Sequence, residues 1–410
     1  MAGPTTPSDV AILRDLAKRY LDVCGKPSQR TRRDLWARKN SLQPTPPLIY
    51  VRAFAWGEMP QSKCLCQNPF YRRHEGFLRN MLFRDTFGDD YVFEPWLTVV
   101  ATHKCTGWGV SIPRAVSGDP RGSFKVDYPI RAEGDLAKLR RPWHEIDEQQ
   151  TAADAQRLGD AVGDIITVNV DRRPAYWMWT ADISSDIGML RGIENFMLDT
   201  MDRPKWLHKL LAFMRDGILA AQDQAEAAGD WGLCDHQNQA MPYSLELKPP
   251  EANACGAKRS ELWAFAAAQE MTLISPRMHD EFMLEYQAPI LSKFGLVAYG
   301  CCEDLTRKID ILRRIPNLRR IAVSPFADTP RCAEQIGTDY VISYRPSPTD
   351  MVGYGFDVDR IRSILRRDLS ACRGLHVDIT LKDVQTVEGD VDRIRKWVGV
   401  TRSVVDEFWS

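Results

Sequence analysis

The chain has 410 residues, with 54 Lys and Arg against 55 Asp and Glu, a formal net charge of −1. This near-neutral balance argues against a nucleic-acid-binding protein, and no apolar run reaches the ~20 residues that cross a bilayer. The first residues lack the basic and apolar regions of a secretory signal. We therefore expect a cytoplasmic enzyme with reduced cysteines and no membrane or nucleic-acid partner.

The N-terminal residues differ in pattern from the rest of the chain. Residues 9–39 repeat apolar side chains at helical spacing, and the proline-rich stretch Pro44–Pro47 follows them. The pattern predicts an N-terminal helical arm over residues 1–46 and a larger unit over residues 47–410.

Short apolar runs alternate with amphipathic segments from Leu48 onward. These runs are mostly apolar without strict alternation, which is typical of strands covered on both faces. The predicted strands are Leu48–Arg52, Tyr91–Phe93, Ile165–Val170, Trp231–Cys234, Leu296–Tyr299, Arg320–Val323, Tyr340–Ser343 and His376–Leu381.

The segments between the strands carry helix punctuation. Pro276 and Pro330 stand in the first turns of two helices that Gly295 and Gly337 end, and Pro204 opens a third. Eight strands alternating with helices predict a (β/α)₈ TIM barrel with the N-terminal helical extension and insertions. A doubly wound open sheet is the alternative. In a barrel, the chemistry takes place at the carboxyl ends of the strands.

Most of the predicted strand ends carry ionisable or thiol side chains. The sequence Tyr299-Gly300-Cys301-Cys302-Glu303 follows the fifth predicted strand. Thiolates bind zinc, but adjacent residues of an extended chain point to opposite faces, so both thiols reach one metal only if Gly300 turns the chain. Two buried thiols beside a helix-starting Glu are the alternative.

Other strand ends supply further candidates. His236, beside Asp235, is predicted as a metal ligand or general base, or as an ordinary loop histidine. Arg52 and Arg345 are candidate carboxylate clamps, because a guanidinium binds carboxylates at two points; structural ion pairs are the alternative. Further strand-end candidates are Glu94, Asp171, Lys382 and Asp383, with Glu58 in the loop after the first strand and Trp56 and Trp96 as ligand walls or core residues.

Several of these stretches resemble the uroporphyrinogen decarboxylase superfamily, and are closest to its cobalamin-dependent methyltransferase-like branch. The resemblance is carried by residues 87–109, 197–214, 274–305, 321–348 and 376–398. It implies a TIM barrel, and it also allows a homodimer. Cys301 stands at the position of the cysteine in the zinc-binding His-x-Cys motif of the methyltransferases, but Tyr299 replaces the histidine and Lys382 or Asp383 replaces the late cysteine.

The resemblance implies a methyltransferase that moves a methyl group from a small methoxylated or methylated molecule to a corrinoid protein, with zinc assistance. Cys301, Cys302, Glu303 and Glu94 would hold the zinc, and Tyr299, His236 or Lys382 would supply protons. The chain has no corrinoid-binding DxHxxG motif, so cobalamin would arrive on a partner protein. The alternatives are a cofactor-free decarboxylase or lyase acting on a carboxylated substrate, and a barrel that only binds a tetrapyrrole or corrinoid.

Overall fold

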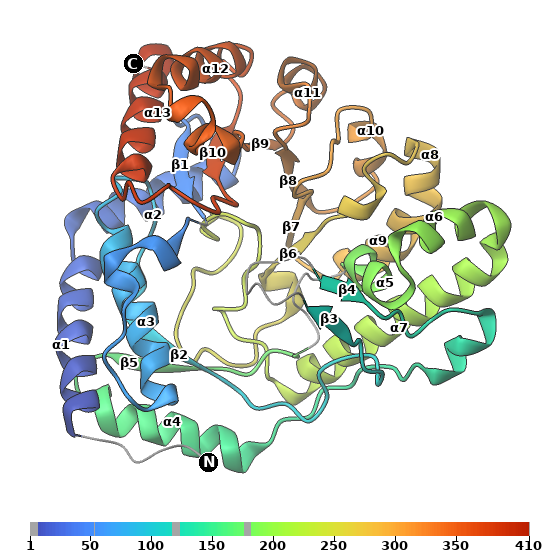
Figure 1. Cartoon of the computed structure of the whole chain (residues 1–410), viewed down its shortest axis with the longest axis horizontal. Coiled ribbons are helices and arrows are strands. Elements are labelled where there is room, and N and C mark those ends of the chain that lie inside the picture. The colour runs from blue at the N-terminus through green and yellow to red at the C-terminus, as the bar shows by residue number, and fades with distance from the viewer. Residues whose placement is uncertain (1–6, 53, 117–123, 176–181, 410) are drawn as a thin grey trace.

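The computed structural model describes residues 7–52, 54–116, 124–175 and 182–409, and it shows an α/β protein (Figure 1). The strands are β1 Leu48–Val51, β2 Trp96–Val100, β3 Arg114–Val116, β4 Phe124–Val126, β5 Thr167–Asp171, β6 Trp263–Ala266, β7 Leu296–Tyr299, β8 Leu318–Val323, β9 Val341–Tyr344 and β10 Val377–Leu381.

Thirteen α-helices accompany the strands in the described part of the chain. They are α1 Pro7–Cys24, α2 Pro27–Asn40, α3 Pro69–Arg84, α4 Glu148–Val162, α5 Ile183–Arg191, α6 Ile193–Asp202, α7 Pro204–Ala228, α8 Pro276–His279, α9 Glu285–Leu291, α10 Ile309–Leu312, α11 Thr329–Ile336, α12 Val358–Ser370 and α13 Arg393–Trp409. A π-helical turn, Asp280–Leu284, joins α8 to α9. No described helix combines the length and hydropathy that a bilayer crossing requires.

The parallel strands form two separate sheets. One has six strands in the order β1-β10-β9-β8-β7-β6, the other pairs β2 with β5, and β3 and β4 make a small antiparallel ribbon. From β6 to β10, each strand lies beside the next one in the chain, and β1 lies beside β10. A doubly wound sheet would instead reverse its strand order near the middle. Among the described residues, no strand pairing joins the two parallel sheets, so the closed eight-stranded barrel is not confirmed.

Most predicted strands lie within two residues of an observed strand, and two are wrong. The second strand starts only after Pro95, so Tyr91–Phe93 precedes it. Residues Trp231–Cys234 lie in a turn after α7, where Gly232 makes an isolated bridge to Cys255. The strand in its place is β6, whose alanine-rich sequence lacks the β-branched residues that favour strands.

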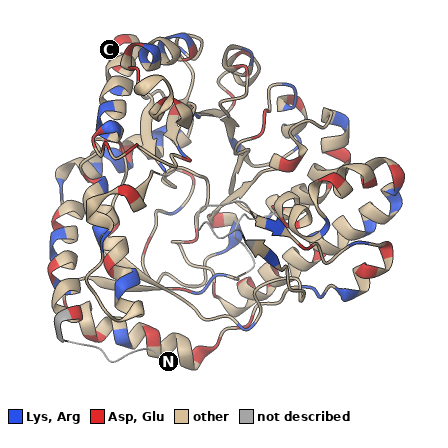
Figure 2. Ribbon diagram, viewed as in Figure 1, with Lys and Arg blue, Asp and Glu red and all other residues tan. Residues whose placement is uncertain are grey.

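The six-stranded sheet has an apolar outer face and a partly polar inner face. Val297, Ile321, Ile342 and Ile379 point outward into the large core that the helices share. Helices α1, α3 and α4 cover β2 and β5 with a second core, and α1 packs against α3 and α4 (Figure 1). The N-terminal helices therefore contact the body directly, and the division at residue 46 stays a prediction. Lys and Arg alternate with Asp and Glu along the outer helices (Figure 2).

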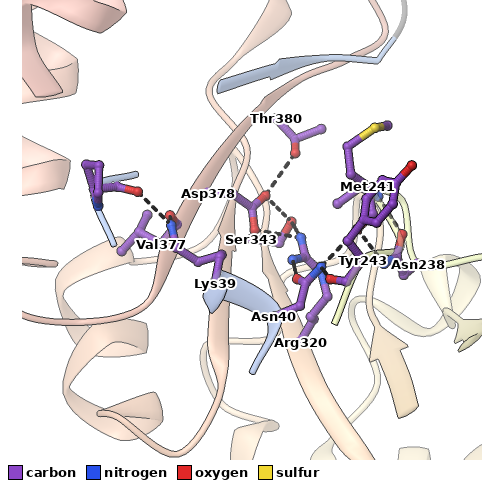
Figure 3. Close-up of polar contacts among 12 residues, drawn as sticks. Lys39, Asn40, Asn238, Met241, Tyr243, Arg320, Ser343, Val377, Asp378 and Thr380 are labelled. Carbon is purple, nitrogen blue, oxygen red and sulfur yellow. Dashed lines mark hydrogen bonds and ion pairs between the residues drawn. The ribbon is translucent and has the colours of Figure 1, made fainter. Parts of the chain in front are cut away.

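A buried ion pair crosses the inner face of the six-stranded sheet (Figure 3). Arg320 on β8 donates from Nη2 to Oδ2 of Asp378 on β10 at 2.6 Å, and these residues are 1% and 0% exposed. Ser343 on β9 and Thr380 each donate to Oδ1 of Asp378 at 3.1 Å. Burying charges is costly unless they are paired and hydrogen-bonded, and this pair is both.

The end of α2 completes this network. Asn40 accepts a hydrogen bond from Nη1 of Arg320 at 2.6 Å, and its amide nitrogen donates to the carbonyl oxygens of Met241 at 2.9 Å and Tyr243 at 2.8 Å (Figure 3). Lys39 donates to the carbonyl oxygens of Pro46 and Val377, and burial lowers its pKa to about 7. Helix α2, the loop at residues 238–243 and three strands are thereby tied together.

We predict that Asp378→Ala lowers the free energy of unfolding by about 3–5 kcal/mol, because the guanidinium of Arg320 stays buried without its charge partner. Urea denaturation followed by circular dichroism measures this loss. The matched control is Asp359→Ala, which removes the 92% exposed partner of Arg362 and should change stability by less than about 0.5 kcal/mol. Equal losses in the two variants would contradict the prediction.

Candidate active site

The thiol pair follows β7 on a turn that requires glycine. Gly300 has φ +94°, and a Cβ atom there would lie 2.5 Å from Cδ1 of Leu305 and 3.1 Å from Cβ of Ala322. This left-handed turn brings Sγ of Cys301 within 3.8 Å of Sγ of Cys302. The two thiols therefore lie together, as the sequence allowed if Gly300 turned the chain.

Lys382, directly after β10, places its ammonium group between the two sulfur atoms. Its Nζ lies 2.8 Å from Sγ of Cys302, 3.2 Å from Sγ of Cys301 and 2.6 Å from Oδ2 of Asp383. Lys382 is 3% exposed, whereas half of the Asp383 side chain is exposed. We call Cys301, Cys302, Lys382 and Asp383 the thiol–lysine cluster.

The contact between Lys382 and the two thiols also indicates the shape of the six-stranded sheet. Strands β8 and β9 lie between β7 and β10. In a flat sheet the ends of β7 and β10 would lie roughly 14 Å apart at the usual strand spacing, which is beyond the combined reach of a lysine and a cysteine side chain. The six-stranded sheet therefore curves toward its inner face, as strands of a barrel do.

The cluster stabilises one thiolate. The hydrogen bond from the Cys302 thiol, with the positive charges of Arg345 and Lys382, lowers the pKa of Cys301 although burial opposes the shift. The same hydrogen bond and burial raise the pKa of Cys302, so the pair holds a single proton at neutral pH. Burial alone would lower the pKa of Lys382, but the Cys301 thiolate keeps it above its usual value.

Glu303 and Arg345 hold the backbone of the thiol pair. Glu303, 1% exposed, accepts hydrogen bonds from the backbone N–H of Ala268 at 2.8 Å and of Cys301 at 2.7 Å. Arg345, directly after β9, donates to the carbonyl oxygen of Cys301 at 2.9 Å. Burial lowers the pKa of Arg345, and the positive charge of Arg52 lowers it further. The two predicted guanidiniums, one after β1 and one after β9, therefore repel each other electrostatically.

The donor set of the expected zinc site does not fit a zinc ion. The Lys382 ammonium takes the position beside both sulfur atoms, and both Glu303 oxygens are bound by backbone N–H groups. Glu94 pairs instead with Arg33 of α2 at 3.3 Å. Within the described residues, no group of three or more His, Cys, Asp or Glu side chains is arranged to hold a metal ion.

Three other predicted site residues have structural partners away from the thiols. The Tyr299 hydroxyl faces the helices, where it donates to Gln287 at 2.9 Å and lies 2.8 Å from Nε2 of His279. Glu58 accepts a hydrogen bond at 2.9 Å from the backbone N–H of Val387, in the loop after β10. Trp56 packs against Phe54 and Phe83, with ring centroids 6.0 and 5.9 Å away.

The remaining predicted residues gather at a second place, next to β2 and β5. A cavity of about 350 Å³ there is lined by Glu94, Trp96, Asp171, Arg173 and His236, among other residues. Asp235 lies beside this cavity, with its Oδ1 3.7 Å from Nη1 of Arg173. The other terminal nitrogen of Arg173, Nη2, pairs with Asp171 at 2.9 Å. The sequence analysis did not identify Arg33 or Arg173 as site residues. Arg173 could have been identified, because it lies two residues past the end of β5, but Arg33 lies within α2 and carries no such signal.

The comparisons with known proteins extend only to the fold. No family model matches the chain, and no curated protein does. Among solved structures, a methyltransferase from Methanosarcina mazei is similar with a TM-score of 0.51. The similarity covers 92% of this chain and 98% of that chain at 13% sequence identity, so it shows a shared fold and no more.

We predict that Lys382→Met slows alkylation of the thiol pair by iodoacetamide at about pH 6. Removing the ammonium raises the thiol pKa, and only the thiolate reacts. Mass spectrometry of the peptide that holds both cysteines measures the rate. Lys396→Met, which changes an exposed lysine paired with Asp390, should leave the rate unchanged. Alkylation at the wild-type rate in the Lys382 variant would contradict the prediction.

Proposed function

We propose that this chain is a methyltransferase of the uroporphyrinogen decarboxylase type. It would take a methyl group from a small methoxylated or methylated molecule and pass it to a corrinoid held by a partner protein. The observation that carries the proposal is the thiol–lysine cluster at the carboxyl ends of β7 and β10, where enzymes with curved parallel sheets place their chemistry. The shared fold with a methyltransferase supports it.

Methyl transfer from such a molecule is slow because the oxygen or nitrogen that leaves is a poor leaving group. The thiol–lysine cluster could stabilise it. When a nucleophile attacks the methyl carbon, the C–O or C–N bond breaks and the bonding electrons stay on oxygen or nitrogen. In this proposal Lys382 donates a proton to that atom, and the Cys301 thiolate favours the protonated lysine beforehand. The corrinoid, when bound, supplies the nucleophile. Because the donors do not fit zinc, the proposal assigns leaving-group stabilisation to Lys382.

Arg345 connects the cluster to a space for a small molecule, although none of the four cluster residues lines that space. Arg345, which binds the carbonyl oxygen of Cys301, also lines a cavity of about 560 Å³ between the ends of β8 and β9 and helices α11 and α12. Hydroxyl groups of Ser324, Ser347 and Thr349 belong to its lining. These groups offer hydrogen bonds to an ether or hydroxyl oxygen of a substrate.

A decarboxylase acting on a carboxylated substrate is the second candidate. The positive charges of Arg52, after β1, and Arg345, after β9, favour it, because guanidiniums at the carboxyl edge of the sheet attract a carboxylate. Release of carbon dioxide, without methyl transfer, would distinguish this activity from the first.

We predict methylcobalamin formation when the protein is incubated anaerobically with cob(I)alamin and a panel of methoxylated aromatic compounds and methylated amines. Visible absorbance follows the product. Lys382→Met and Cys301→Ser should each slow the reaction by about 10²-fold or more, as loss of proton donation does. Lys396→Met should retain the wild-type rate. Carbon dioxide release from carboxylated compounds with no methylated product from the panel would contradict the proposal.

A further inference from the structure

The cavity beside β2 and β5 has no role in the proposed reaction, and its lining is that of a ligand site. Its wall is formed by Tyr91, Val92, Glu94, Trp96, Thr98, Val100, Asn169, Asp171, Arg173, Cys234, His236, Met241, Pro242, Tyr243 and Pro250. Val100, at the carboxyl end of β2, is 54% exposed, so the cavity is accessible from that end. We call this space the β2–β5 pocket.

Acidic groups exceed basic groups around the β2–β5 pocket. Glu94 pairs with Arg33, and Arg173 is shared between Asp171 and Asp235, so three carboxyl groups face two guanidiniums. Burial raises the pKa of Glu94 to about 7. Burial and the charge of Asp171 raise the pKa of Asp235 in the same direction. These shifts keep protons on part of the carboxyl groups in the pocket, and a bound cation would stabilise their ionised forms.

Aromatic rings line the same space. Trp96 and Tyr243 belong to the wall, and the faces of such rings attract cations once water is excluded. The ring of Tyr91 also belongs to it, but the guanidinium of Arg84 already lies 3.9 Å from its centroid. Carboxylates together with aromatic faces are the combination that recognises organic ammonium groups. The apolar side chains of Val92 and Met241 suit the methyl or methylene groups that surround such a charge.

His236 adds a buried imidazole to the wall of the pocket. Both of its ring nitrogens are buried with the backbone of Leu233 as hydrogen-bond neighbour, and one oxygen of Glu94, Oε1, is buried and unpaired. Burial lowers the pKa of His236 to about 4, so the imidazole is neutral and has one donor and one acceptor nitrogen. Buried polar groups left unpaired cost free energy, and a hydroxyl or carbonyl group on a ligand would satisfy this imidazole.

We propose that the β2–β5 pocket binds a small organic ammonium compound that also carries a hydroxyl or carbonyl group. The positive charge lies against Glu94 and the aromatic rings, and the polar group meets His236. The pocket shares no lining residue with the thiol–lysine cluster, so the inference does not rest on the proposed function.

Isothermal titration calorimetry with choline tests this proposal, and 3,3-dimethylbutanol, the neutral compound of the same shape, is the matched ligand. We expect choline to bind the wild-type protein at least about tenfold more tightly than the neutral compound. Comparable affinity for the two compounds, or no binding of choline, would overturn the proposal.

Two variants locate the site. Glu94→Gln keeps the hydrogen-bond acceptor for Arg33 but removes the negative charge, so choline affinity should fall at least about tenfold. Trp96→Leu removes one aromatic face and should also weaken binding, with the thermal unfolding of both ligand-free variants checked first. Cys302→Ser, at the other cluster, should keep wild-type affinity. Full affinity in both pocket variants, or loss of affinity in Cys302→Ser, would overturn the assignment.

Discussion

The contact between Lys382 and the two thiols imposes a curvature that the rest of the site depends on. Two strands separate β7 from β10, and only a curved sheet brings their ends within reach of one lysine side chain. On the same inner face, the Arg320–Asp378 pair joins β8 to β10 and is bonded to the end of α2. A buried charge is costly without its partner. Two contacts therefore hold the curvature, one at the strand ends and one within the sheet.

The thiol–lysine cluster and the β2–β5 pocket differ in charge. The positive charges of Lys382 and Arg345 lie beside the thiols and favour a thiolate, and the thiolate in turn favours a protonated lysine. The β2–β5 pocket has an excess of carboxyl groups, and burial keeps protons on part of them. The two proposals thus assign an acid–base pair to the thiol–lysine cluster and an ammonium-binding site to the β2–β5 pocket.

The sequence showed that ionisable and thiol side chains follow the strands, but it did not predict which of them meet. The turn at Gly300 was foreseeable, because a glycine before two cysteines allows both thiols to face one way. The position of Lys382 after the last strand was also foreseeable, but its contact with Cys302 depends on the curvature of the sheet, which no local pattern encodes. Glu94 was assigned to the metal site because its strand was placed before Pro95 instead of after it. Strand β6 was missed because four apolar residues with two alanines do not differ from a short helical segment.

The central claim is that the thiol pair carries a thiolate at neutral pH because the hydrogen bond from Cys302 and the charges of Arg345 and Lys382 stabilise it. Ultraviolet difference absorbance between the wild-type protein and a Cys301→Ser/Cys302→Ser double variant, recorded as a pH titration, measures the ionisation of this pair alone. We predict one thiolate equivalent that persists well below pH 7, and a second ionisation only at strongly alkaline pH. A pair that ionises at the ordinary thiol pKa of roughly 8.5 would contradict the account.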